Sequence, residues 1–201
     1  FICLSEASDA AKVRATKMLA RTCAEICDGQ SMDMAFEKRN DVSEAEYLEM
    51  VSKKTGVLYG ASAAIGGILA GANPIQTDAL YQFGLNSGIA FQIQDDLIDL
   101  LASPEISGKD QASDIREGKQ TLIAIKAREK GIDLAPYRRS LSPEEINDLI
   151  AKLKDAGVID EVREKAVERA TVAKEALSVL PNSEEKRLLS EIADFFIDRG
   201  N

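Results

Sequence analysis

Three acidic side chains lie inside an otherwise apolar stretch of this chain, residues 88–99, which reads GIAFQIQDDLID. On a helix, Asp95 and Asp99 stack one turn apart on one face. Gln92 lies on that same face, and Asp96 points about a quarter-turn away. Carboxylates in apolar surroundings are costly unless they are paired or bind a metal. The stretch therefore predicts a helix whose acidic side chains bind a cation.

Basic residues are absent between residues 55 and 108, so these acids have no local ion-pair partner, but several follow directly. Lys109 opens a polar stretch that also holds Asp114, Arg116 and Lys119. Mg²⁺ usually binds through one or two carboxylates together with water and substrate phosphates. The acids and the stretch after them suit a diphosphate held by both Mg²⁺ and ammonium groups. An acid trio alone is often a solvated helix face, but the apolar flanks and the lysines favour the metal–diphosphate site.

Signals for helices recur along the whole chain. Ser43 and Glu46 form a capping box at the start of the helix that carries Lys54. No strand alternation or hairpin turn stands out, so the predicted fold class is all-α. Helices are predicted over residues 4–27, from Ser43, from Asn73-Pro74 to Ser103-Pro104, from Ser142-Pro143 and from Asn182-Ser183.

The composition narrows the possible functions. A length of 201 residues suits one domain with a substantial core. The formal net charge of −9 argues against nucleic-acid binding. The chain has no His, which excludes Ser-His and Cys-His catalysis and His-ligated metals.

Residues 56–72 carry no charge and are rich in Gly and Ala. Gly56 and Gly60, like Gly67 and Gly71, have the spacing of membrane helices that pair closely. The run is short for a membrane span, so we expect a helix buried in a bundle and no transmembrane segment.

The three cysteines are Cys3, Cys23 and Cys27. An odd number without a secretory pattern indicates reduced thiols and a cytoplasmic protein. Cys23 and Cys27 share a helix face that could bind a soft metal, but free cysteines are usually buried, and burial is the expectation here.

The tail from residue 142 to residue 201 is charged, with apolar residues at helical spacing. It predicts outer helices that pack on a core and carry little chemistry. The apolar positions are Leu149, Ile150 and Leu153, then Ile192, Phe195 and Phe196.

The acidic segment and the polar stretch after it together resemble the second aspartate-rich region of the trans-type isoprenyl diphosphate synthases, such as farnesyl and geranylgeranyl diphosphate synthases. Two upstream segments resemble that family's motifs in the same order. The matching residues are Gly29-Gln30-x-x-Asp33, Tyr47-Leu48 with Lys54-Thr55-Gly56, Phe91-Gln92-x-Gln94-Asp95-Asp96-x-x-Asp99, Gly108-Lys109, Asp114 and Gly118-Lys119-x-Thr121.

The resemblance implies an isoprenoid-synthase-type helical bundle around a central cavity, acting as a homodimer. It also implies a prenyltransferase that condenses isopentenyl diphosphate with an allylic diphosphate. The chain lacks the family's first aspartate-rich motif, the arginine pair after it and the N-terminal basic positions. We therefore expect residues 1–201 to be the C-terminal part of a single synthase domain, without the N-terminal helices and inactive alone.

The resemblance also implies roles for individual residues. Lys54, Thr55, Gln92 and Lys109 would be catalytic, with the Thr55 and Gln92 oxygens facing a carbocation. Arg199 resembles a basic C-terminal position that helps some members hold isopentenyl diphosphate. The remaining roles are Mg²⁺ binding by Asp95, Asp96, Asp99 and Asp114, diphosphate binding by Lys54, Lys109 and Lys119, and support by Gln30, Asp33 and Gln94.

Two other interpretations stay open at this point. The missing first motif fits a non-catalytic partner subunit of such an enzyme. A helical binding protein with a coincidental acid cluster would leave the lysines as ordinary surface residues, which is the usual place for Lys.

Overall fold

A computed structural model describes residues 1–102 and 111–199, and these residues form helices and connecting turns without a strand. The predicted all-α fold class is confirmed. The elements are η1 (Ile2–Leu4), α1 (Asp9–Phe36), α2 (Glu44–Val51), η2 (Ser52–Gly56), α3 (Val57–Leu69), α4 (Pro74–Leu101), α6 (Ser113–Glu117), α7 (Leu122–Glu129), η3 (Ala135–Tyr137), α8 (Pro143–Asp155), α9 (Val158–Ala176), η4 (Leu177–Val179) and α10 (Glu184–Asp198).

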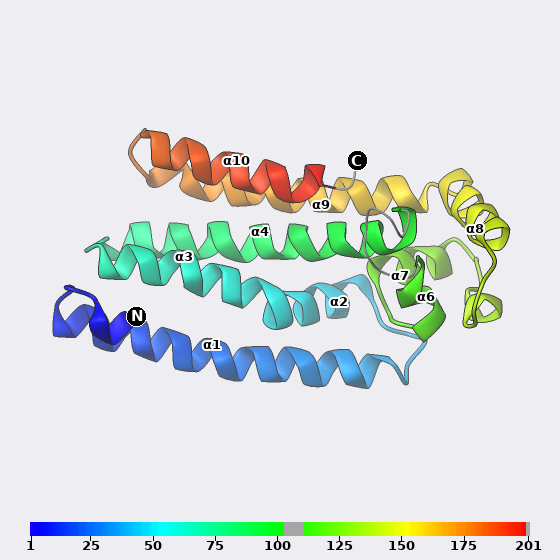
Figure 1. Cartoon of the computed structure of the whole chain (residues 1–201), viewed down its shortest axis with the longest axis horizontal. Coiled ribbons are helices and arrows are strands. Elements are labelled where there is room, and N and C mark those ends of the chain that lie inside the picture. The colour runs from blue at the N-terminus through cyan, green and yellow to red at the C-terminus, as the bar shows by residue number, and fades with distance from the viewer. Residues whose placement is uncertain (103–110, 200–201) are drawn as a thin grey trace.

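The long helices lie roughly side by side (Figure 1). α1 runs along one side, α3 and α4 occupy the middle, and α9 with α10 covers the opposite side. The short helices α6 and α7 and helix α8 gather at the end of the bundle where α1 and α4 finish. The acidic residues of α4 therefore lie at the end that these short helices cover.

The predicted helix starts are confirmed in detail. The Ser43 hydroxyl accepts the Glu46 backbone N–H at 3.3 Å, and the Glu46 carboxylate accepts the Ser43 N–H at 2.9 Å. Each such bond satisfies an amide that the first helical turn leaves without a partner. The same reciprocal cap forms at Asn73 and at Ser142, and Ser183 caps α10.

The boundaries of the first helix differ from the prediction of residues 4–27. The Ser8 side chain caps the helix, so α1 begins at Asp9. It then continues to Phe36 through the polar residues around Gly29. Asp33 consequently lies on this long helix, near the end of the bundle where α1 and α4 finish.

The helix that carries Lys54 is continuous with α3 but contains one wider turn. Residues Ser52–Gly56 form the π-helical segment η2 between α2 and α3. Such turns are rare and often lie at functional sites. Lys54 and Thr55 both belong to this turn.

The Gly- and Ala-rich segment forms α3, which packs closely against α4. A Cβ atom on Gly84 would lie 2.3 Å from the Tyr59 carbonyl oxygen, so only glycine permits this approach of the two backbones. Ala61, Ala64 and Ile68 of α3 are buried. In the described part of the chain, every helix is too short or too polar to cross a membrane. The expected bundle helix is present, but one face of it is exposed, with Leu58 at 47%.

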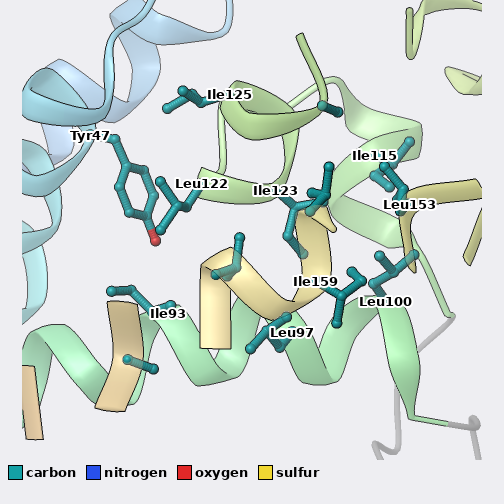
Figure 2. Close-up of a cluster of buried hydrophobic side chains, with 14 of the residues drawn as sticks. Tyr47, Ile93, Leu97, Leu100, Ile115, Leu122, Ile123, Ile125, Leu153 and Ile159 are labelled. Atoms are coloured by element: carbon teal, nitrogen blue, oxygen red, sulfur yellow. The ribbon is translucent and has the colours of Figure 1, made fainter. Parts of the chain in front are cut away.

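A large apolar core holds the acid-bearing half of α4 against α7, α8 and α9 (Figure 2). Burying one aliphatic side chain contributes roughly 1.5–3 kcal/mol, so this cluster fixes α4 firmly. Its labelled members in Figure 2 are Tyr47, Ile93, Leu97, Leu100, Ile115, Leu122, Ile123, Ile125, Leu153 and Ile159.

The tail packs on this core largely as predicted. Leu149 and Leu153 are fully buried on α8. On α10 the prediction was partly wrong, because Ile192 and Phe195 are exposed and the buried residue is Ala193.

The cysteines depart from expectation. Cys3, Cys23 and Cys27 are all exposed, so the expectation of buried thiols was wrong for this chain. Cys23 and Cys27 lie on α1, and the buried residues of that helix are instead Ala15, Thr22, Gly29 and Phe36.

The close contact of α3 and α4 makes Gly84→Ala a test of the packing. The added Cβ would clash with the Tyr59 backbone, which cannot relieve the clash by a rotamer change as a side chain could. We expect the free energy of unfolding to fall by about 2 kcal/mol, as measured by chemical denaturation.

Gly66→Ala is the matched control on α3. A Cβ at Gly66 meets nothing within 4 Å, and alanine favours a helix over glycine. Its stability should be unchanged or higher, and equal destabilisation of the two variants would contradict the close packing.

Candidate active site

A polar pocket of about 320 Å³ lies where α1, η2 and α4 meet α6 and the start of α7. Among the described residues that line it, acidic residues outnumber basic residues. The acids are Asp33, Asp95, Asp96, Asp99 and Asp114, and the bases are Lys54 and Lys119.

Asp95 lies at the mouth of this pocket, with 37% of its side chain exposed. The Arg199 guanidinium donates to the Asp95 carboxylate at 3.3 Å and to the Phe91 carbonyl oxygen at 3.0 Å. It also stacks on the Phe91 ring, 3.5 Å from the ring centroid. A cation for Asp95 therefore comes from Arg199, which lies 104 residues later in the chain.

Gln94 fixes the backbone that carries Arg199. Its side-chain amide donates to the Arg199 carbonyl oxygen at 2.8 Å. Gln94 is buried, so it supports the end of α10 and does not line the pocket.

Asp99 anchors the start of α6. One carboxylate oxygen accepts the Ser113 hydroxyl, and the other accepts the Asp114 backbone N–H at 3.0 Å. The Asp99 carbonyl oxygen accepts the Ala112 N–H at 2.7 Å. Burial raises the pKa of Asp99, although these hydrogen bonds oppose the shift. Each carboxylate oxygen keeps a second lone pair, so Asp99 can still bind a cation.

Asp96 is buried between α4 and α2. Its two oxygens accept the Tyr47 hydroxyl at 2.7 Å and the Gln92 side-chain amide at 3.0 Å. Burial raises the pKa of Asp96 to about 7, while the hydrogen bond from Gln92 opposes that rise. Burial and the adjacent Asp96 charge also raise the pKa of Tyr47.

Thr55 joins this network from the wide turn. Its hydroxyl donates to the Gln92 side-chain oxygen at 3.1 Å. Both residues line the pocket and are partly exposed to it. The side chains therefore form one chain of hydrogen bonds from Thr55 through Gln92 to Asp96.

Lys54 is paired with Asp33 across the two helices, at 2.5 Å. Gly29, one turn before Asp33, makes this possible, because a Cβ there would lie 2.3 Å from the Lys54 backbone nitrogen. Glycine thus lets α1 touch η2 backbone to backbone, and Asp33 reaches the lysine.

Lys119 is paired with Asp114 at 2.6 Å on the opposite wall. Burial would lower the pKa of Lys119, but the hydrogen bond and charge of Asp114 outweigh it and raise the pKa. Lys119 therefore carries its charge at neutral pH. The two lysines that line the described part of the pocket are held by carboxylates, so an anionic ligand meets an excess of negative charge there unless it arrives with cations.

Comparison with known proteins places this geometry in a family. A model of the family described as polyprenyl synthetase matches residues 1–153. The chain belongs to the polyprenyl synthetase family.

Individual relatives agree with this assignment. The chain is 49% identical over 197 residues to a geranylgeranyl pyrophosphate synthase of Geoglobus acetivorans, a match that covers 98% of this chain and 61% of the relative. It is 48% identical to a geranylfarnesyl diphosphate synthase of Natronomonas pharaonis, over 93% of this chain and 55% of the relative. The chain thus spans about three fifths of the length of these curated polyprenyl synthetases.

Solved structures give the same fold. The geranylgeranyl pyrophosphate synthetase structure from Geoglobus acetivorans superimposes with a TM-score of 0.90 at 47% identity, covering 98% of this chain and 62% of that one. A polyprenyl synthase from Caulobacter crescentus, complexed with calcium and isoprenyl diphosphate, superimposes with a TM-score of 0.84 at 30% identity, covering 94% and 60%. The predicted isoprenoid-synthase fold is therefore confirmed.

Most of the predicted site residues of this family member meet in one pocket, although their roles stay predictions. Gln30 is exposed on α1 and does not line the pocket. Lys109 lies outside the described residues. The predicted residues that do line it are Asp33, Lys54, Thr55, Gln92, Asp95, Asp96, Asp99, Asp114 and Lys119.

Two features of the polyprenyl synthetase pocket were missed by sequence reasoning. Tyr47 belongs to one of the family motifs, and no sequence signal indicates that its hydroxyl donates to Asp96. Arg199 was assigned to isopentenyl diphosphate, yet in this structure it contacts Asp95. The spacing of 104 residues between Arg199 and Asp95 left no local signal for that pair.

The anchoring role of Asp99 can be tested by hydrogen exchange. Asp99→Ala removes the acceptor for the Ser113 hydroxyl and the Asp114 N–H. Hydrogen bonds to a charged group contribute roughly 1.5–3 kcal/mol, so amide exchange over α6 should accelerate at least about tenfold.

Asp148→Ala on the exposed side of α8 is the control for that experiment. It should leave exchange over α6 unchanged. Unaltered exchange over α6 in Asp99→Ala would show that other contacts hold this helix.

Proposed function

We propose that the protein is a prenyltransferase, which condenses isopentenyl diphosphate with an allylic diphosphate to give a longer trans-polyprenyl diphosphate. The observation that carries this proposal is the single pocket in which Lys54, Thr55, Gln92 and Asp95 meet. The family and the names of the relatives support it. That residues 1–201 are the C-terminal part of one synthase domain, and that the protein forms a cytoplasmic homodimer, stay predictions.

The residues of the pocket fit a divalent cation that is shared with a diphosphate. In the described ranges, no three Asp, Glu or Cys residues converge closely enough to hold an ion alone. Mg²⁺ does not need such a cage, because it usually binds one or two carboxylates, waters and substrate phosphates. Among the pocket residues that the structure describes, aspartates outnumber lysines, and this also favours a cation that accompanies the diphosphate. We assign this role to Asp95 and Asp99, with Asp114 beside them.

The bond changes of the reaction are simple to state. The allylic C–O bond breaks, diphosphate leaves, the double bond of isopentenyl diphosphate attacks the allylic carbon, and a proton is lost. Bound Mg²⁺ supplies positive charge to the leaving diphosphate oxygens.

The side chains of the pocket act on both charged parts of this reaction. Lys54 and Lys119 neutralise phosphate oxygens, for which each must turn from its carboxylate partner. Thr55 and Gln92 present oxygen atoms to the allylic carbon as positive charge develops there.

The proposal predicts a Mg²⁺-dependent condensation by the full-length protein. Asp95→Ala should lower turnover by at least about 100-fold, because it removes charge at the leaving group. The rate of product formation is measured by chromatography with labelled isopentenyl diphosphate. The far-ultraviolet circular dichroism of Asp95→Ala should match that of the parent protein.

Asp148→Ala is the matched control and should turn over at the rate of the parent protein. Normal turnover by Asp95→Ala would contradict the metal assignment. Absence of condensation in the parent protein, with Mg²⁺-dependent binding of diphosphate retained, would favour the non-catalytic partner subunit.

A further inference from the structure

The buried carboxylate of Asp96 has no direct use in the reaction proposed above. Its two oxygens accept hydrogen bonds from Tyr47 at 2.7 Å and from Gln92 at 3.0 Å. Only 6% of the residue is exposed. A buried carboxylate is costly, and a neutral or apolar residue would serve packing alone at least as well. The carboxylate therefore points to a role that needs a strong acceptor.

That role follows from the chemistry of the Gln92 amide. An amide group has a donor side and an acceptor side, whereas Asp96 in its ionised form only accepts hydrogen bonds. The Gln92 nitrogen must therefore face Asp96, and its oxygen must face the other way. On that other side lies Thr55, whose hydroxyl donates to the Gln92 oxygen at 3.1 Å.

The orientation of Thr55 is fixed in turn. Its only hydroxyl hydrogen is used in the bond to Gln92, so its oxygen keeps free lone pairs. The wall of the pocket at this point thus carries the Gln92 and Thr55 oxygens, and one N–H of the Gln92 side chain is held by Asp96. Oxygen dipoles stabilise developing positive charge, and a flipped amide would oppose it.

Tyr47 holds the acceptor itself in place. The residue is 1% exposed and belongs to the apolar core drawn in Figure 2. The hydroxyl reaches Asp96 from α2, so the rigid core determines where the carboxylate points.

We infer that Asp96 and Tyr47 are positioning residues, which lock the Gln92 amide so that the Gln92 and Thr55 oxygens face the carbocation. This inference rests on the proposed prenyl transfer. It differs from the sequence-based assignment of Asp96 to Mg²⁺.

The kinetic test uses Asp96→Asn and Tyr47→Phe in the full-length protein, since both keep the side-chain size. Asp96→Asn should lower kcat roughly 10- to 100-fold. The KM values and the Mg²⁺ concentration for half-maximal rate should stay within about threefold, because binding groups are untouched. Tyr47→Phe should lower kcat less than Asp96→Asn does. If Asp96→Asn does not fold, Tyr47→Phe decides whether the positioning role holds. A lowered kcat supports the role, and an unchanged kcat overturns it.

A double variant shows whether Asp96 acts through Gln92. In a Gln92→Ala background, Asp96→Asn should cause no further loss of kcat, because there is no amide left to orient. Asp148→Asn and Tyr137→Phe, which do not line the pocket, are the matched controls and should retain full kcat.

A separate readout does not depend on turnover. The side-chain ¹⁵N–¹H₂ signals of Gln92, assigned by their loss in Gln92→Ala, should show slow hydrogen exchange in the parent protein. In Asp96→Asn the exchange should accelerate, since the amide is no longer locked.

The outcomes separate this inference from the proposed function. A parent protein without condensation activity overturns the proposed function and, with it, the catalytic half of the inference. If the parent protein is active, three results with Asp96→Asn would overturn the inference alone. These are an unchanged kcat, a raised Mg²⁺ requirement, and a full additional loss of kcat in the Gln92→Ala background. Unchanged Gln92 exchange in Asp96→Asn also overturns it.

Discussion

The contact between α1 and the wide turn η2 is the constraint on which the pocket depends. Gly29 lies so close to the Lys54 backbone that a methyl group would not fit. Because the two backbones touch, Asp33 lies within reach of the Lys54 ammonium. A bulkier residue at Gly29 would separate the helices, and the lysine side of the pocket would move away from the acids on α4.

Much of this structure could be predicted because its signals are local. The caps at Ser43, Asn73 and Ser142 each need only a side chain and an amide three residues away, and all three form. The stacking of Asp95 and Asp99 follows from helix periodicity, and both residues line the pocket. The grouping of Lys54 with the acids of α4 came from the family resemblance, since no local rule connects residues that lie on different helices.

The features that escaped prediction depend on tertiary structure. Asp95 and Asp96 are neighbours in sequence, yet one lies at the pocket mouth beside Arg199 and the other is buried beneath Tyr47. Periodicity alone gives their directions but does not say which direction is covered. The cysteines show the same limit, because composition predicts their average burial and the packing of α1 decides it.

The wide turn η2 also sets the relative orientation of two packing surfaces, the core-facing side of α2 and the α4-facing side of α3. It adds one residue to a helical turn, so every later side chain is rotated by about 100° relative to an unbroken helix. The chain before it aims Tyr47 at the core, and the chain after it aims the small residues of α3 at α4. A single-residue deletion here would restore ideal helix geometry and still misalign one of these surfaces. The number of residues at this point is therefore constrained in addition to their identity.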